Sequence, residues 1–202
     1  MKLTATLILS AALSASAWVS PKLSNSRLGT SLDAASIWYS TSTGNTETIA
    51  GYIADASGAA ANDIGDASND EITGSDCLIV GAPTWHTGAD EQRSGTSWDD
   101  WLYDTLPSLE LEGKKVAIFG CGDQESHADY YCDAAGELYD QFTAKGCKVY
   151  GLTSTDGYNH ADSKAQRDGK FIGLMCDEDN QYDMSEDRAK AWIAQLKDEG
   201  FF

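Results

Sequence analysis

The residues best suited to bind a ligand lie in a stretch rich in hydroxyl groups, Thr41-Ser42-Thr43-Gly44-Asn45-Thr46. An apolar run over residues 34–39 precedes it and predicts a short buried strand, and an apolar pattern with helical period begins at Ile49. The first N–H groups of a helix have no partner within the helix, and the helix dipole adds roughly half a positive charge there. We therefore expect this junction to hold an anion.

Two better-known phosphate loops do not match this stretch. A P-loop requires a lysine directly after its last glycine, but Asn45 follows Gly44, and no Lys or Arg lies between Arg27 and Arg93. The glycine-rich segment at residues 120–125 lacks the third glycine of the dinucleotide fingerprint. An anion site without a cation suits the monoester phosphate of a cofactor, held by amides and hydroxyls. The alternative is a Ser/Thr-rich turn that only caps the helix.

The rest of the chain alternates apolar runs with helical patterns. Strands are predicted at residues 34–39, 59–65 (a weak edge candidate), 76–82, 115–119 and 147–152, with strand character resuming at 171–176. Helices are predicted after Ile49, from Ser97 to Asp100 onwards with a capping box, before Lys145-Gly146 on a face that starts at Tyr131, and around Trp192. This alternation predicts one α/β domain with a doubly wound, five-stranded parallel sheet in the order 2-1-3-4-5.

In that topology ligands bind beyond the carboxyl ends of the strands, at the switch between strands 1 and 3. Three loops leave those ends, at residues 41–46, 83–95 and 120–130. The second and third loops bring Trp85 and His127 from opposite sides to a slot that a flat ring could fill. Because Trp85 lies in a polar loop where burial is not expected, we favour a ligand wall over a core role.

The chain resembles the flavodoxins from about Ala35 to its C-terminus. The matching motifs are Thr41-Ser42-Thr43-Gly44-Asn45-Thr46, Pro83-Thr84-Trp85-His86-Thr87-Gly88, Phe119-Gly120-Cys121-Gly122-Asp123-Gln124, Ser154-Thr155-Asp156-Gly157-Tyr158 and Asp177-Glu178-Asp179-Asn180-Gln181. The polar stretch at residues 153–170, which interrupts the fifth strand, resembles the insertion of the long-chain class. The fold implied is flavodoxin-like.

The resemblance implies FMN as the cofactor, with no catalytic residue and no metal ligand. Residues 41–46 would hold the phosphate, Trp85 would cover one face of the ring, and residues 86–88 and 121–123 would meet the ring edge. The implied FMN-binding residues are Thr41, Ser42, Thr43, Gly44, Asn45, Thr46, Thr84, Trp85, His86, Thr87, Gly88, Cys121, Gly122, Asp123, His127, Tyr130 and Asp179.

One position departs from the family pattern. Long-chain flavodoxins usually place a tyrosine on the outer face of the flavin, where this sequence has His127. Tyr130 or Tyr131 are candidates to supply the missing ring. We expect the flavin to be retained and its redox potentials to differ.

The resemblance implies a low-potential one-electron carrier rather than an enzyme. Such a protein shuttles electrons from photosystem I to ferredoxin-NADP reductase in place of ferredoxin, and we expect it to be a monomer. The alternative is an FMN-dependent NAD(P)H quinone reductase of the same fold, although the lack of bases between Arg27 and Arg93 argues against an NADPH phosphate site there. A flavin-free binding module would require the matching motifs to be coincidental.

The charge of the chain is strongly negative. Its 202 residues include 32 Asp and Glu against 14 Lys and Arg, a formal net charge of −18. Residues 1–33 hold three basic side chains and one acid, so the remainder carries −20. Such a surface repels nucleic acid and anionic membranes and attracts a basic protein partner, here the reductase and photosystem I. The alternative is that the acidity serves only solubility.

The N-terminus has the composition of a targeting segment. Lys2 precedes an apolar run at residues 3–13, and Ala15-Ser16-Ala17 fits a cleavage site, so residues 1–17 are predicted as a signal peptide, too short to span a membrane in the mature protein. Residues 18–33, rich in serine, are similar to a transit peptide. This pair resembles the bipartite presequence of algae with secondary plastids, which leaves residues 34–202 as the FMN-binding domain.

We therefore predict the plastid stroma as the location, with secretion as the alternative. The five cysteines are an odd number, and Cys77, Cys147 and Cys176 lie in apolar, strand-like runs. That usage favours a reducing compartment over a disulfide framework.

Overall fold

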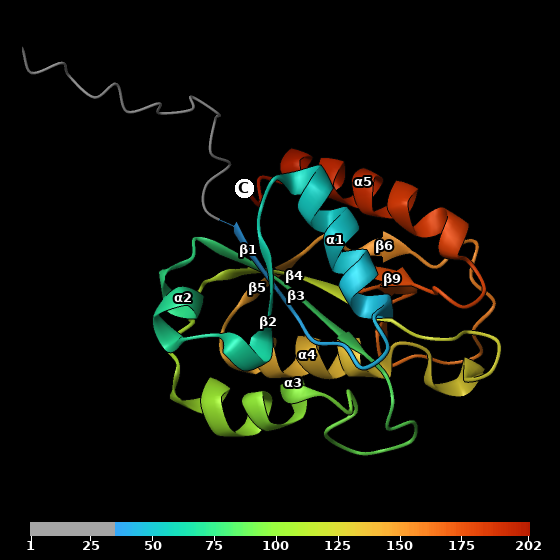
Figure 1. Cartoon of the computed structure of the whole chain (residues 1–202), viewed down its shortest axis with the longest axis horizontal. Coiled ribbons are helices and arrows are strands. Elements are labelled where there is room, and N and C mark those ends of the chain that lie inside the picture. The colour runs from blue at the N-terminus through green and yellow to red at the C-terminus, as the bar shows by residue number, and fades with distance from the viewer. Residues whose placement is uncertain (1–34) are drawn as a thin grey trace, which may run out of the picture. The chain divides into compact units, whose positions relative to one another are not determined.

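A parallel sheet forms the centre of the computed structural model, which describes residues 35–202 (Figure 1). The sheet runs in the order β2-β1-β3-β4-β5, with β9 also on β4, and every one of its pairs is parallel. Its strands are β1 (Ala35–Tyr39), β2 (Ala61–Asp63), β3 (Cys77–Pro83), β4 (Lys115–Cys121), β5 (Lys148–Tyr150) and β9 (Leu174–Cys176). The predicted doubly wound order is confirmed. The predicted signal peptide and transit-like segment lie outside the described residues.

The fifth strand consists of two pieces that lie end to end along β4. β5 pairs with residues 115–117 of β4, and β9 pairs with residues 119–121. Gly173 lies at the junction, where a Cβ atom would come 1.8 Å from the carbonyl oxygen of Ile118, so no other residue fits. The intervening insertion forms a small antiparallel sheet from β6 (Thr153–Ser154), β7 (Gln166–Arg167) and β8 (Lys170–Phe171). The predicted interruption of the fifth strand is confirmed.

Helices cover both faces of the sheet (Figure 1). α1 (Asn45–Ser57) and α5 (Tyr182–Asp198) pack on one face, and α3 (Ser97–Asp100) and α4 (Asp133–Ala144) pack on the other. Successive strand residues point to opposite faces, so Ile37 packs with α1 and α5 while Trp38 packs with α3 and α4. Both faces are buried, which explains why the central strands are continuously apolar.

The short helices on the way from β2 to β4 differ from the sequence prediction. The N-cap of α3 is Thr96, whose side chain makes no capping hydrogen bond to the helix, so the predicted capping box of Ser97 and Asp100 is wrong. The capping box is formed instead by Ser68 and Glu71, at the start of α2 (Asn69–Gly74), which follows η1 (Ile64–Asp66). After α3 the chain continues through one π-helical turn, η2 (Trp101–Thr105), and one 3₁₀ turn, η3 (Leu106–Ser108).

Within residues 35–202 no helix combines the length and the apolar character that crossing a membrane requires.

Candidate functional site

A cavity of about 360 Å³ opens beyond the carboxyl ends of β1, β3 and β4. All three loops that the topology predicted contribute to its wall. The lining residues are Thr43, Asn45, Thr46, Pro83, Thr84, Trp85, Thr87, Cys121, Gly122, Asp123, His127, Tyr130 and Asp179. Five further predicted site residues lie beside this lining without being part of it: Thr41, Ser42, Gly44, His86 and Gly88.

The first wall is the hydroxyl loop (residues 41–46), which leads into α1. Gly44 occupies the N-cap position with a left-handed backbone (φ 95°), a conformation that favours glycine, and its N–H donates to Thr41 Oγ1 at 3.0 Å. No side chain of residues 35–202 caps this helix. This argues against the alternative of a turn that only caps the helix. The first amides of α1 have no side-chain partner within the described residues, and Asn45 and Thr46 of this first turn line the cavity.

Thr46 provides the most specific feature of the hydroxyl loop. Its side chain is buried, and within the described part of the chain its Oγ1 has no hydrogen-bond partner. A buried polar group left without a partner costs about 1–3 kcal/mol. No Lys or Arg of residues 35–202 lines the cavity. An anionic oxygen in the hydroxyl loop would satisfy both Thr46 and the free amides without a counter-charge from a basic side chain.

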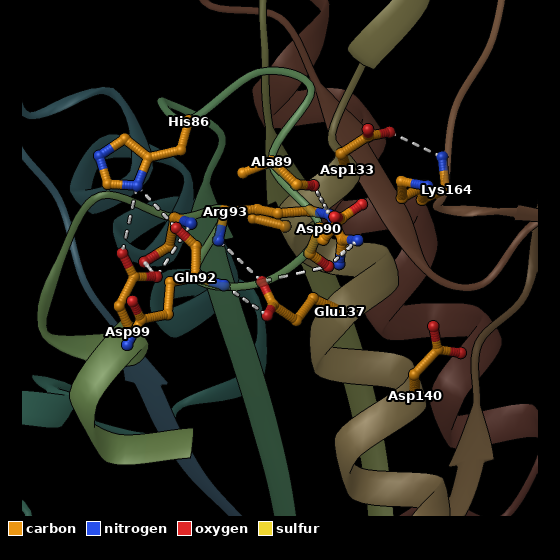
Figure 2. Close-up of polar contacts among 12 residues, drawn as sticks. His86, Ala89, Asp90, Gln92, Arg93, Asp99, Asp133, Glu137, Asp140 and Lys164 are labelled. Atoms are coloured by element: carbon orange, nitrogen blue, oxygen red, sulfur yellow. Dashed lines mark hydrogen bonds and ion pairs between the residues drawn. The ribbon is translucent and has the colours of Figure 1, made fainter. Parts of the chain in front are cut away.

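The second wall is the tryptophan loop (residues 84–96). Trp85 is 50% exposed and lines the cavity, as expected for a residue that presents its ring to a ligand. The N–H groups of Trp85 and His86 both donate to the carbonyl oxygen of Arg93, at 3.1 Å each. His86 is not part of the cavity lining, and its Nδ1 lies 2.7 Å from the Gln92 carbonyl oxygen and 3.7 Å from Asp99 Oδ2 (Figure 2).

The third wall is the loop after β4, which includes η4 (Ala128–Tyr130). Asp123 accepts hydrogen bonds from the N–H groups of Glu125 and Ser126 and from the side chain of Asn180. Partial burial acts to raise the pKa of Asp123, but the hydrogen bonds from Ser126, Asn180 and Glu125 outweigh it and lower the pKa to about 2. Asp123 is therefore an anion that can only accept hydrogen bonds, for example from ligand hydroxyls.

A buried carboxylate joins this third wall to the segment after β9. Asp177 is fully buried and accepts hydrogen bonds from the backbone and side chain of Gln124 and from the backbone and side chain of Asn180. It also accepts the N–H of Asp179, the acid that lines the cavity. Asp179 is thus held at the cavity by a neighbour with no part in the lining.

The comparisons with known proteins bear on the same residues. The family model described as flavodoxin matches residues 37–192. The chain belongs to the flavodoxin family. A flavodoxin of Nostoc sp. is 45% identical over 168 residues, which cover 81% of this chain and 95% of the relative. A flavodoxin of Haemophilus influenzae is 42% identical, with 81% of this chain and 93% of the relative covered.

A solved structure of similar fold comes from Fusobacterium nucleatum, a flavodoxin bound to flavin mononucleotide. It is 30% identical, with a TM-score of 0.71, and the match covers 82% of this chain and 97% of that one. Flavodoxins are electron-transfer flavoproteins and not enzymes, so membership of the family decides against a quinone reductase.

Two residues are candidates to cover the outer face of the flavin, where long-chain flavodoxins usually have a tyrosine. His127 and Tyr130 both line the cavity, and a Cβ atom at Gly88 would lie 3.5 Å from the Tyr130 ring. Tyr131 is wrong as a candidate, because it is fully buried and packs against Phe171 of the insertion. The predicted helix face also begins later than Tyr131, since left-handed Cys132 (φ 55°) precedes α4.

Three buried thiols lie in or next to the cavity wall. Cys121 lines the cavity, and Cys176 lies opposite Cys121 where strand β9 pairs with strand β4. Burial raises the pKa of the Cys121 and Cys132 thiols well above the usual range, and that of Cys176 to about 12. Because the thiolate is the reactive form, these groups are packing residues and not nucleophiles at neutral pH.

Sequence reasoning missed the charged groups that hold the site from behind. These are Arg93, Asp99, Glu137 and Asp177, of which the three acids are buried. One signal was available for Arg93, which is the first Lys or Arg after Arg27 and follows two acids, Asp90 and Glu91. Glu137 and Asp177 have partners that lie far away in the sequence, Gln92 and Gln124, so the sequence offers no such signal for these two acids.

Proposed function

We propose that this flavodoxin binds FMN in the cavity and carries single electrons. The observation that carries the proposal is the buried hydroxyl of Thr46, which has no partner among residues 35–202 and lies beside the free amides of α1. A terminal phosphate satisfies these donors, and a flat ring system fills the space between Trp85 and the third wall. The Fusobacterium nucleatum flavodoxin of similar fold is bound to the same cofactor.

FMN supplies the one-electron chemistry when it is bound. The chain's own residues do the rest: the hydroxyl loop binds the phosphate, and Trp85 shields one face of the ring from water. Asp123 and Asp179 line the cavity as acceptors for the hydroxyl groups of the ribityl chain. No residue is required to act as an acid, a base or a nucleophile.

The proposed role is to move electrons from photosystem I to ferredoxin-NADP reductase in the plastid stroma, in place of ferredoxin. The charge of −20 on the chain beyond residue 33 supports a basic docking partner and disfavours nucleic acid. Relatives in the cyanobacteria Nostoc and Picosynechococcus, the latter 42% identical, fit a photosynthetic role. We propose that the protein works as a monomer, because an electron carrier needs only an accessible ring edge.

Stepwise reduction of the FMN-loaded protein, followed by its visible spectrum, tests the carrier proposal. We expect reduction in two separate one-electron steps. Uptake of both electrons together, at one potential, would contradict a one-electron carrier.

The salt dependence of electron transfer to a ferredoxin-NADP reductase tests the partner. The Debye length falls from about 30 Å at 0.01 M salt to about 8 Å at 0.15 M. We expect the association rate to fall steeply over this interval, because steering by opposite charges acts on the rate of encounter. A rate that does not change with salt would point to an apolar docking surface instead.

A further inference from the structure

A buried carboxylate on α4 holds the tryptophan loop from behind (Figure 2). Glu137 is 3% exposed, and its two oxygens accept the N–H groups of Gln92 at 2.7 Å and Arg93 at 2.8 Å. The hydroxyl of Tyr103 donates to the same carboxylate, and Arg93 Nη1 lies 3.9 Å from it. Four groups therefore depend on one buried carboxylate, whose removal would leave partly buried donors without this partner.

Arg93 carries this restraint from Glu137 to the cavity. Its guanidinium donates to the carbonyl oxygens of Ala89 and Asp90, which folds residues 89–93 around the side chain. Its own carbonyl oxygen accepts both the Trp85 and the His86 N–H groups. A single residue, Arg93, thus separates the carboxylate from the backbone of the tryptophan that lines the cavity.

The backbone next to Arg93 requires such a restraint. Gln92 has a left-handed conformation (φ 56°), which is uncommon and strained for residues other than glycine. The bond from the Gln92 N–H to Glu137 holds this conformation in place. Without it, we expect the tryptophan loop to adopt other backbone conformations.

We propose that Glu137 is a positioning residue for flavin binding, which sets the place of Trp85 through Arg93 without touching the ligand. The inference rests on the proposed function only for the identity of the ligand. The restraint itself exists in the protein without FMN and can be measured there.

Glu137 has a matched control on the same helix. Asp133 lies one turn before it, is 2% exposed, and accepts one backbone N–H, that of Lys164 at 2.7 Å. Asp133 therefore holds the insertion, while Glu137 holds the tryptophan loop (Figure 2). Comparing Glu137→Gln with Asp133→Asn separates the loss of a buried charge on α4 from the loss of the restraint on the loop.

The experiment measures two quantities in wild type, Glu137→Gln and Asp133→Asn. The first is amide hydrogen exchange of Trp85 and His86 in the FMN-free protein, and the second is the FMN dissociation constant from flavin fluorescence. In Glu137→Gln we expect faster exchange at both amides, although neither contacts Glu137, and FMN binding weaker by about tenfold, or about 1.4 kcal/mol. In Asp133→Asn we expect both quantities to stay within about twofold of wild type.

Two outcomes would overturn the proposal. One is exchange that accelerates equally over the whole sheet in Glu137→Gln, which would show a general role in stability. The other is equal FMN affinity in the two variants. If Glu137→Gln does not fold, Tyr103→Phe removes one bond to the same carboxylate, and unchanged exchange and affinity in that variant would overturn the proposal as well. Failure of the wild type to bind FMN would instead overturn the proposed function and leave the exchange result standing.

Discussion

The hydroxyl loop and the tryptophan loop line the same cavity but are built in different ways. The hydroxyl loop is held by bonds between near neighbours, such as the Gly44 N–H with Thr41 and the Thr48 hydroxyl with the Gly44 carbonyl oxygen. The tryptophan loop is held by Glu137, which lies 45 residues beyond Gln92 in the chain. The hydroxyl loop should therefore respond only to changes in or next to it, whereas the tryptophan loop can be altered from a distance.

The largest expected effect in this comparison is removal of the phosphate from the ligand. Riboflavin lacks the group that the hydroxyl loop binds, and a hydrogen bond to a charged group contributes about 1.5–3 kcal/mol. With at least two such bonds lost, riboflavin should bind at least about 100-fold more weakly than FMN. Titration of each flavin with quenching of its fluorescence measures this. Equal affinities for riboflavin and FMN would show that the hydroxyl loop does not bind the phosphate.

The next effect concerns the ring that the tryptophan loop presents. Trp85→Ala should weaken FMN binding by about 1–3 kcal/mol, the range for stacking of a flat ring on an aromatic side chain. Tyr182→Ala is a suitable control, because Tyr182 is also an exposed aromatic residue but lies outside the cavity lining. A loss of equal size in both variants would mean that Trp85 does not stack on the flavin.

Thr46→Val should have opposite effects on binding and on stability. The variant loses a donor to the phosphate, so FMN should bind about 1–2 kcal/mol more weakly. It also loses a buried hydroxyl that has no partner in residues 35–202, so the FMN-free protein should gain up to about 1 kcal/mol in free energy of unfolding. Thr48→Val is the matched control, since the Thr48 hydroxyl is exposed and bonds to the Gly44 carbonyl oxygen. Denaturant unfolding of the FMN-free proteins measures whether the substitution raises or lowers the free energy of unfolding.

The third wall is held both by near neighbours and by a distant residue, since Asp123 accepts bonds from Glu125, Ser126 and Asn180. The stability that Asp123 contributes should depend on pH. The pKa of Asp123 falls to about 2 in the folded protein, against about 3.9 for an unfolded aspartate. Its stabilisation is therefore fully present above about pH 4 and is lost as the pH falls toward about 2. Because Asp123 is partly solvated, we expect about 1 kcal/mol. Asp123→Asn should lower the free energy of unfolding at pH 6 but leave it nearly unchanged at pH 2.

The smallest expected effect is at His127. His127→Tyr enlarges the ring that can cover the outer flavin face, which should tighten FMN binding by about 0.5–1.5 kcal/mol. A neutral, electron-rich ring also disfavours added negative charge, so uptake of the second electron should shift to lower potential. Unchanged affinity and potential in His127→Tyr would assign the outer face to Tyr130.

The sequence was sufficient for the features that local chemistry determines. Gly44 and the hydroxyls around it define an anion loop within six residues, and the apolar strands at Cys77 and Lys115 define the sheet order once helices alternate with them. Helix starts proved less predictable. Ser97 and Asp100 have the spacing of a capping box, but the N-cap of this helix is Thr96. The carboxylate of Asp99 accepts the N–H groups of Ser94 and Gly95, in the loop before the helix. That choice depends on how residues 84–96 fold.

The buried acids that hold the cavity walls were not predictable either, because their hydrogen-bond partners depend on the fold. Nothing in the local sequence of Glu137 or Asp177 distinguishes a buried acid from the many exposed ones of this acidic chain. Only the fold brings Gln92 to the first and Gln124 to the second. Tyr131 was misplaced likewise, because its burial depends on the insertion that covers it.

The division of the fifth strand has a consequence for how the insertion could be gained or lost. Tyr150 pairs opposite Ala117 and Leu174 opposite Phe119, and Gly173 packs against Ile118 between them. Removal of residues 151–172 would join Tyr150 to Gly173 and give one continuous strand in the same register on β4. The insertion thus lies outside the parallel pairing of the sheet, and the bond from the Thr153 hydroxyl to the Gly173 carbonyl oxygen closes its base. A single deletion or insertion event can interconvert a long and a short form of this sheet without re-pairing any other strand.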